Sequence, residues 1–397
     1  MNTLKSTRIE SIDILRGLVM VIMALDHVRD YYHLNAFTSV DPMNVDTTNP
    51  MLFFTRFITH YCAPIFLFLA GTSAFLYGQK RTKNQLSKFL ITRGIWLILV
   101  EIVVNNFLWW FDPSFGFINL QVIWAIGVCM IVLGVAIYLP KKIILSIGIL
   151  IVFLHNTLDI YNLKDKAVGF FDHFWYAIHQ LGGMQIGENR FLSFSYPVLP
   201  WIGVIFLGYC FGYFYKKDFD ITIRRKWLLY LGFGCITLFF VVRGINVYGD
   251  LNPWTSQETF EKTMYSFFNL AKYPPSLSFL LITLGPAFLF LYFIENLKNW
   301  FTNFLLVFGR VPFFYYILHI FVVHAGAILG LLITGGNWRN MILTNDVFQQ
   351  GKLAGYGYSL WVVYLVWIVI IAVLYPICKR YMKYKARNKE KWWLSYL

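Results

Sequence analysis

Apolar segments of membrane-spanning length follow one another along almost the whole chain. A helix that crosses a bilayer needs roughly 20 mostly apolar residues, and short polar or basic stretches separate the segments that meet this requirement. We therefore predict an all-α, polytopic integral membrane protein with about ten transmembrane helices, forming a single domain over residues 1–397. The predicted spans are 10–32, 51–78, 89–110, 118–139, 142–160, 192–214, 227–247, 275–295, 303–333 and 355–378.

Composition supports this interpretation and argues against a soluble protein. Of the 397 residues, 58% are hydrophobic and only 14% are charged, which is too apolar for one soluble core. The first span contains Asp13 and Arg16 and has no small-residue cleavage site after it, so we do not interpret it as a removable signal peptide. The five cysteines show no paired spacing and predict neither disulfides nor a zinc site.

The distribution of basic residues predicts how the chain is oriented. The formal net charge is +14, but Lys and Arg gather at the ends of apolar runs and so do not indicate nucleic-acid binding. With the N-terminus in the cytosol, most of the 34 Lys and Arg fall on the inner side, from Lys5 and Arg8 to the basic tail at 379–397. This bias satisfies the positive-inside rule, so we expect both termini to be cytosolic.

The longer loops all fall on the outer side under this topology. They are rich in aromatic and polar residues, and we predict that an acceptor site is built there. The two halves of the chain share no recurring motif and no matching pair of Gly/Pro-broken helices, so the sequence gives a transporter duplication no support. The four loops are 33–50, 161–191, 248–274 and 335–354.

The first span carries the densest set of ionisable residues. A charge within the bilayer is costly, so each such residue is a functional candidate, with helix packing as the alternative. Arg16 and His27 are eleven positions apart, which places them within about 20° of one helix face and about 16 Å apart along the axis. Tyr31 extends the His27 face by one turn. Asp26 and Arg29 form an i, i+3 pair that either neutralises itself or takes part in the chemistry.

The second span places another histidine at the same outer level. His60 and Arg56 lie one turn apart, so we expect His27 and His60 to face one cavity, although His60 fits a packing role equally well. Imidazole has a pKa near ~6.5, which suits a general base that deprotonates an amine or hydroxyl attacking a thioester. We predict that His27 is this base. His27, His33 and His60 with Asp26 lack the local spacing of a metal site, so no metal is expected.

Other polar residues within the spans have structural interpretations. Glu101, Asn105 and Asn106 in the third span, and His155 with Asn156 in the fifth, are expected to form interhelical hydrogen bonds. In the ninth span Arg310 stands at the inner end, where it could meet a phosphate, with Tyr315, Tyr316 and His319 deeper in the membrane. Walker, GxGxxG-after-strand and GxSxG motifs are absent, so nucleotide hydrolysis, dinucleotide redox chemistry and serine hydrolysis lack their usual signals.

Several segments, spread over nearly the whole chain, together carry a family resemblance. They are SIDILRGLVMVIMALDHVRDYYH, ITHYCAPIFLFLAGTSAF, LQVIWAIG, YPVLPWIGV, RGINVYGDLNPW, KYPPSLSFLLITLGP and GRVPFFYYILHI. These segments resemble those of the bacterial DUF1624 membrane proteins, a family grouped with the catalytic domain of heparan-alpha-glucosaminide N-acetyltransferase. That lysosomal enzyme acetylates the terminal glucosamine of heparan sulfate with cytosolic acetyl-CoA.

A second resemblance bears on the catalytic residue. The spacing from Arg16 to His27 is similar to the Arg-x10-His signature of membrane acyltransferase-3 proteins, which acylate cell-surface sugars, and it implies a catalytic role for His27. The lysosomal enzyme differs, because it has an asparagine at the position of His27 and its essential histidine lies in the following outer loop. His33 is the nearest counterpart here, so the division of labour among His27, His33 and His60 stays open.

These resemblances imply an acyltransferase in a bacterial inner membrane, with dimers common among such proteins. Acetyl-CoA would dock from the cytosol and an amino sugar or glycan would accept the acetyl group at the outer face. The expected catalytic residues are His27, His60, Asp26 and His33, and the expected cofactor-binding residues are Arg16, Arg310, Tyr315 and His319. The alternative is a transporter or a lipid- or small-molecule-binding membrane protein without acyl transfer, and a noncatalytic structural membrane protein is a third possibility.

Overall fold

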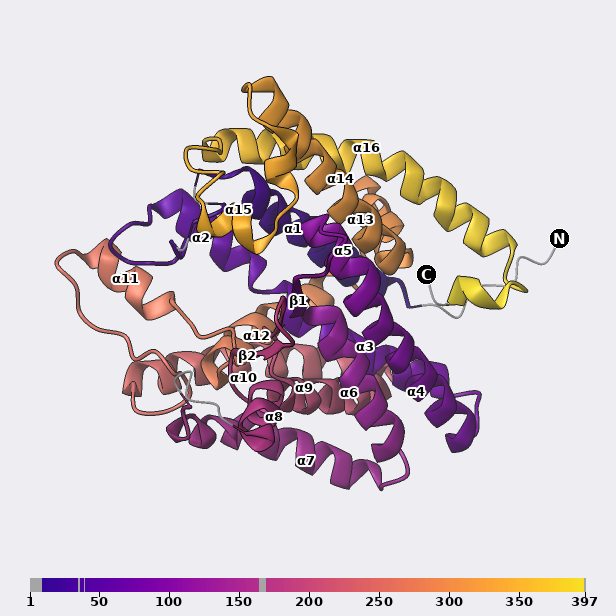
Figure 1. Cartoon of the computed structure of the whole chain (residues 1–397). Coiled ribbons are helices and arrows are strands. Elements are labelled where there is room, and N and C mark those ends of the chain that lie inside the picture. The colour runs from indigo at the N-terminus through magenta and orange to yellow at the C-terminus, as the bar shows by residue number, and fades with distance from the viewer. Residues whose placement is uncertain (1–8, 35, 39, 164–168, 396–397) are drawn as a thin grey trace.

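The structure is a computed structural model of the chain, and it describes residues 9–34, 36–38, 40–163 and 169–395. Lys5, Arg8 and the last two residues of the basic tail lie outside the described residues. The chain folds mainly into helices, which gather into one bundle (Figure 1).

Each of the ten predicted spans contains helix, and several are built from two pieces. A π-helical turn, Glu101–Asn105, joins α4 to α5, and short 3-10 turns extend α7 and α9. The helices are α1 (Glu10–Tyr32), α2 (Pro50–Thr59), α3 (Cys62–Gly78), α4 (Lys83–Val100), α5 (Asn106–Trp110), α6 (Val122–Ala136), α7 (Lys141–Leu154), α9 (Val198–Phe211), α10 (Ile221–Ile245), α12 (Leu277–Ile294), α13 (Trp300–Arg310), α14 (Pro312–Ile333) and α16 (Leu360–Arg387).

The protein is an integral membrane protein by the length and hydropathy of its helices. Among the described residues, seven helical stretches are long and apolar enough to cross a bilayer. The two other long helices, α1 and α4, carry more charged residues, and α6 is shorter. A count of about ten crossings and a cytosolic location of both termini therefore stay predictions. The seven stretches are Pro50–Gly78, Lys141–Ile160, Val198–Tyr215, Ile221–Ile245, Leu277–Ile294, Pro312–Ile333 and Leu360–Arg387.

Three segment boundaries differ from the prediction for identifiable reasons. The long ninth span breaks at Val311, because Pro312 has no N–H to donate and instead starts the new helix α14. The spans predicted from 118 and 192 begin later, at Val122 and Val198, because the preceding residues are β-strands. The fold is therefore helical with a small sheet, where an all-helical fold was expected.

The sheet joins two connections that are far apart in the sequence. Its strands are β1 (Phe117–Leu120), β2 (Gly182–Ile186) and β3 (Arg190–Phe194), in the order β1-β3-β2. β1 runs parallel to β3, and β2 pairs antiparallel with β3. The α5–α6 connection and the loop before α9 are thereby held at the same end of the bundle. Short helices occupy the longer loops, namely α8 (Phe170–Ile178), α11 (Phe260–Phe268) and α15 (Asn345–Gln349).

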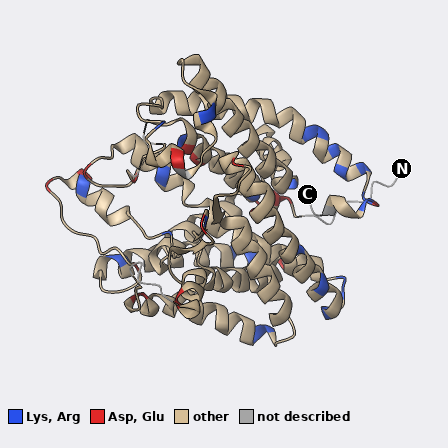
Figure 2. Ribbon diagram, in the orientation of Figure 1, with Lys and Arg blue, Asp and Glu red and all other residues tan. Residues whose placement is uncertain are grey.

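Charge is distributed unevenly between the two ends of the bundle. Lys and Arg gather along the last turns of α16 and at the start of α4, on one side of the molecule (Figure 2). The loop that carries α11 lies at the opposite edge of the molecule, and the sheet lies near the middle of the view (Figure 1). The positive-inside rule assigns a basic side of this kind to the cytosol, and the orientation of the chain stays a prediction.

The helix α1 lies inside the bundle and packs against α2, α3, α12, α13, α14 and α16. Its closest approach is to α13, where two glycines face each other's backbone. A Cβ atom on Gly17 would come 1.9 Å from the carbonyl oxygen of Leu305, and one on Gly309 would come 1.8 Å from that of Asp13. Small residues allow helix backbones to approach closely in membranes, where packing replaces the hydrophobic effect as the driving force.

The α1–α13 crossing yields a stability prediction. Gly309→Ala forces two backbones apart, so we expect it to destabilise the folded protein by about 3 kcal/mol, at the upper end of ordinary overpacking effects. Thermal unfolding in detergent measures the change. The matched control is Gly244→Ala in α10, where an added Cβ meets nothing within 4 Å. Equal unfolding temperatures for the two variants would contradict the assigned packing.

Candidate active site

Two neighbouring cavities lie where the long loops meet the helix ends. The outer cavity has a volume of about 580 Å³ and is lined by residues from three of the four predicted outer loops. The inner cavity, of about 120 Å³, lies between α1, α3 and α14, and Trp109 and Gln121 are also part of its lining. Five residues line both cavities and so form the junction between them: Arg29, Asp30, Arg56, Lys272 and Tyr273.

His27 lies in the wall of the inner cavity and is only partly buried. Its Nδ1 is 2.7 Å from Nε2 of His319 on α14, and the two rings stack with centroids 4.9 Å apart. Trp109 meets the His27 ring edge-on at 4.9 Å. The ring of Tyr316 meets that of His27 edge-on at 6.1 Å, so the imidazole is held on three sides while it still lines the cavity.

The hydrogen bonds behind His27 determine which of its nitrogens carries the proton. Nδ1 of His319 lies 3.1 Å from the carbonyl oxygen of Tyr315. A carbonyl only accepts, so in neutral His319 the proton is on Nδ1 and Nε2 is the acceptor. His27 must then donate from its own Nδ1, which leaves its Nε2 unprotonated. This assignment from the hydrogen-bond network gives His27 the tautomer that a general base needs.

Asp26 is held by two arginines. Nη1 of Arg56 lies 2.9 and 2.7 Å from the two carboxylate oxygens of Asp26. Nη2 of Arg29 is 2.9 Å from the same carboxylate, which is the i, i+3 pair expected from the sequence. Arg29 also pairs with Asp30. Asp26 therefore takes part in a charge network that ties α1 to α2 at the cavity junction.

The other two candidate histidines line the outer cavity. His60 is buried where α2 meets α3, with its ring 5.2 Å from that of Phe279. Its position corrects the expectation that it shares one cavity with His27, because the two lie on different cavities. His33 follows the last turn of α1 and forms a β-bridge with Tyr358. Burial and the neighbouring Arg29 lower the pKa of His33 below its ordinary value.

The residues expected to bind the cofactor separate into two groups. Arg16 donates to Asp13 at 2.8 Å, to Ser73 at 2.8 Å and to the carbonyl of Gly309 at 3.3 Å, beside the α1–α13 crossing. Arg310 pairs with Glu10 at 3.1 Å at the beginning of α1. Tyr315 and His319 lie elsewhere, stacked on each other behind His27 with centroids 5.0 Å apart. The structure thus brings His319 to the candidate base and leaves the two arginines near the opposite end of α1.

The N-terminal part of the chain matches a known protein family. Residues 8–240 match the family profile described as heparan-alpha-glucosaminide N-acetyltransferase, catalytic. The chain belongs to this family. Membership confirms the resemblance predicted from the sequence and indicates a membrane acetyltransferase. No individual curated protein sequence matches the chain.

The portion that matches this acetyltransferase family includes α1 and ends within α10. His27, Asp26 and Arg56 lie inside it, whereas Lys272 and His319 lie beyond it. The cavities of this family member are therefore completed by the C-terminal part of the chain. Among the residues that the structure describes, no three His, Cys, Asp or Glu side chains are arranged to hold a metal ion.

Polar residues deeper in the bundle act mainly as helix connections. Glu101 lies in the π-helical turn and accepts from the backbone N–H of Trp124 at 3.0 Å, which caps the start of α6. Asn106 bonds both the carbonyl and the N–H of Asn119, and Asn156 accepts from the N–H of Leu277. His155 was expected to form an interhelical hydrogen bond, but within the described part of the chain neither of its ring nitrogens has a hydrogen-bond partner.

Sequence reasoning missed a buried arginine that shapes the junction. Arg243 of α10 is 2% exposed and donates to four backbone carbonyls in the following loop, and it lies 3.7 Å from the Asp250 carboxylate. Asp250 in turn accepts from Ser276 Oγ at 2.5 Å and from the N–H of Ala271. The signal was present in the segment RGINVYGDLNPW, because an arginine at the end of a span needs acceptors. The four carbonyls are those of Asn252, Ser266, Phe267 and Asn269.

Removal of this arginine should loosen the loop that carries Lys272. Arg243→Ala leaves several buried carbonyls without a donor, and we expect about 3 kcal/mol of lost stability because each unsatisfied group costs about 1–3 kcal/mol. Limited proteolysis between residues 250 and 276, together with thermal unfolding, reports the change. The control is Arg190→Ala at the exposed start of β3. Unchanged protease resistance in Arg243→Ala would refute the role.

Proposed function

We propose that this protein transfers an acetyl group from cytosolic acetyl-CoA to an amino sugar or glycan at the outer face of a bacterial inner membrane, with His27 as general base. Family membership supports the reaction class. The observation that carries the assignment of the base is the His27–His319 pair, which holds an unprotonated imidazole nitrogen beside the inner cavity. The outer cavity, formed by the long loops, is where the acceptor binds.

The geometry supports the following proton transfers. The acceptor enters from the outer cavity and its amine or hydroxyl attacks the carbonyl carbon of the thioester in the inner cavity. Nε2 of His27 takes the proton that the nucleophile loses, and it returns this proton to the departing thiolate of coenzyme A. His319 accepts a hydrogen bond from Nδ1–H of His27 throughout, so it fixes the tautomer and stabilises the imidazolium, as the orienting member of a catalytic triad does.

Arg310 and Arg16 are proposed to receive the phosphates or pantetheine of acetyl-CoA from the cytosolic side. The Arg310 side chain is 29% exposed and that of Arg16 is 16% exposed, so Arg310 is the more accessible cation. Moving charged coenzyme A through the hydrocarbon would be costly, whereas a neutral acyl group crosses easily. The face of α1 from Arg16 to His27 would then mark the direction of acyl transfer.

A second candidate function is a transporter or small-molecule-binding protein that carries out no acyl transfer. Two adjoining cavities lined with charges also suit a substrate path. Cleavage of the acetyl-CoA thioester discriminates between the acetyltransferase and the transporter, because a transporter does not cleave acetyl-CoA. The ordered imidazole pair favours the enzyme.

The first prediction of the enzymatic proposal concerns His27. Purified protein in detergent, supplied with acetyl-CoA and glucosamine, should release free coenzyme A, and His27→Ala should lower kcat at least 100-fold because the general base is lost. Chromatographic quantification of free coenzyme A measures the rate. His173→Ala in α8, which lines neither cavity, is the matched control and should retain wild-type turnover. If the wild-type protein acetylates none of the amino sugars or glycans tested, that result would support the transporter or binding function instead.

The second prediction concerns His319. His319→Leu removes the acceptor for Nδ1–H of His27 and should lower kcat by about 100-fold, with the unfolding temperature close to that of wild type. His319→Gln keeps a side-chain oxygen that can accept this hydrogen bond and should recover part of the loss. Equal kcat values for His319→Leu and wild type would show that the pair has no catalytic role.

A further inference from the structure

Three cations line the junction between the two cavities, and two of them are already paired. Arg56 is held by Asp26, and Arg29 is held by Asp26 and Asp30. For Lys272, no ion pair to a carboxylate occurs within the described part of the chain. Its ammonium instead lies 5.1 Å from the ring centre of Tyr273. Lys272 is therefore the junction cation that forms no ion pair with a carboxylate in the described residues; it interacts with Tyr273, and an ammonium has three N–H donors, so it can also donate to a bound group.

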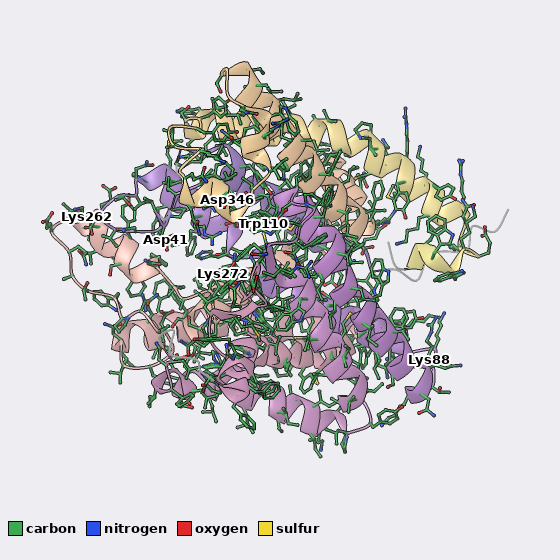
Figure 3. The ribbon with its side chains drawn as sticks, in the orientation of Figure 1. Asp41, Lys88, Trp110, Lys262, Lys272 and Asp346 are labelled. Atoms are coloured by element: carbon green, nitrogen blue, oxygen red, sulfur yellow. The ribbon has the colours of Figure 1, made fainter. Side chains whose placement is uncertain are left out.

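The backbone that carries Lys272 is fixed in place. Lys272 forms a β-bridge with Pro275, and the N–H of Ser276 donates to the carbonyl of Ala271 at 2.9 Å. Asp250 binds the two ends of this turn through Ala271 and Ser276. Figure 3 shows Lys272 near the middle of the molecule, in contrast to Lys262 at the edge on α11. The lysine is thus presented to the cavities by a rigid support, as a charge that acts in catalysis requires.

The position of Lys272 relative to His27 restricts what it can do. Both residues line the inner cavity, whose volume of about 120 Å³ leaves room for little more than the reacting groups. Lys272 also lines the outer cavity, whereas His27 does not. An atom at the junction, approached by a nucleophile from the outer cavity and by the base from the inner one, therefore lies within reach of the ammonium.

We propose that Lys272 stabilises the oxyanion formed during acyl transfer, an inference that rests on the proposed function. When the nucleophile adds to the thioester carbonyl, the π-electron pair moves to oxygen and a negative charge develops there. The Lys272 ammonium donates a hydrogen bond to this oxygen and keeps its proton. His27 meanwhile removes the proton of the nucleophile; the carbonyl then re-forms and the C–S bond breaks. A fixed cation in a site that excludes water stabilises such a charge more than water does.

The neighbouring Tyr273 lies close to the positive charges of Lys272 and Arg56. Burial alone would raise the pKa of Tyr273, but Lys272 and Arg56 outweigh that effect and hold the pKa below its ordinary value. A negative oxygen is therefore favoured at the junction. The hydroxyl of Tyr273 lies 3.4 Å from the hydroxyl of Tyr196, and both tyrosines line the inner cavity.

The test compares Lys272→Met with Lys272→Arg and with wild type, using glucosamine as acceptor and acetyl-CoA as donor. We expect Lys272→Met to lower kcat by about 100-fold, as loss of one oxyanion donor does, while KM for the acceptor changes less than about threefold because the charge acts only in the transition state. Lys272→Arg keeps a cation and should recover part of kcat. Lys262→Met, on a partly exposed lysine of the same outer loop that lines neither cavity, is the matched control.

Two outcomes would overturn the inference. A rise in KM for the acceptor with kcat unchanged would assign Lys272 to binding of the acceptor. A kcat equal to that of Lys262→Met would remove it from the reaction altogether. Both are distinct from failure of the proposed function, which would appear as absence of turnover in wild-type protein. Unfolding temperatures of all variants in detergent identify any loss caused by misfolding.

Discussion

The structure depends on the requirement that charged groups inside an apolar bundle find partners. The helix α1 carries acidic and basic residues from its first turn to its last, and an unpaired charge in that setting would be prohibitively costly. Each end of the helix meets the requirement differently. At its start Arg16 is held by Asp13, Ser73 and a backbone carbonyl of α13, and near its other end Asp26 is held by two arginines. Pairing these charges places α1 inside the bundle with α2, α3 and α13 around it.

The same pairing makes a reactive site possible between the two ends. Asp26 pairs with both Arg56 and Arg29, whereas Lys272 forms no ion pair with a carboxylate in the part of the chain that the structure describes. The inner cavity also contains an imidazole whose tautomer is set by His319. A neutral base and a positive charge that line the same small cavity suit a reaction in which a proton leaves the nucleophile while negative charge develops on a carbonyl oxygen. The ion pairs of Asp26 with Arg29 and Arg56 therefore stabilise the structure, while His27 and Lys272 are the two groups proposed to act in the reaction.

Most of the helices follow from the pattern of apolar residues along the chain. The exceptions are a helix break at a proline and a sheet formed by segments far apart in the sequence. Each of the ten segments predicted from apolar length contains helix, because a span is a property of consecutive residues. The break at Pro312 was also visible in the sequence, as a residue without an N–H, but it was absorbed into one long apolar run. The small sheet could not be foreseen in the same way. β1 pairs with β3 across some seventy residues of intervening chain, and short apolar runs do not reveal such partners by periodicity.

For the candidate site, the sequence by itself determined which ionisable residues lie within apolar spans, where their free-energy cost implies a structural or functional role. It singled out His27, Arg16 and Asp26 on the first span, and the four longer loops predicted to lie outside, three of which line the outer cavity. Only the tertiary structure decided the partners: His319, 292 positions away, lies against His27, while His60 lines another cavity and Lys272 joins the two. Helical periodicity states which face of a segment a residue occupies, but contacts between distant segments depend on how whole helices pack, and that packing is a property of the complete chain.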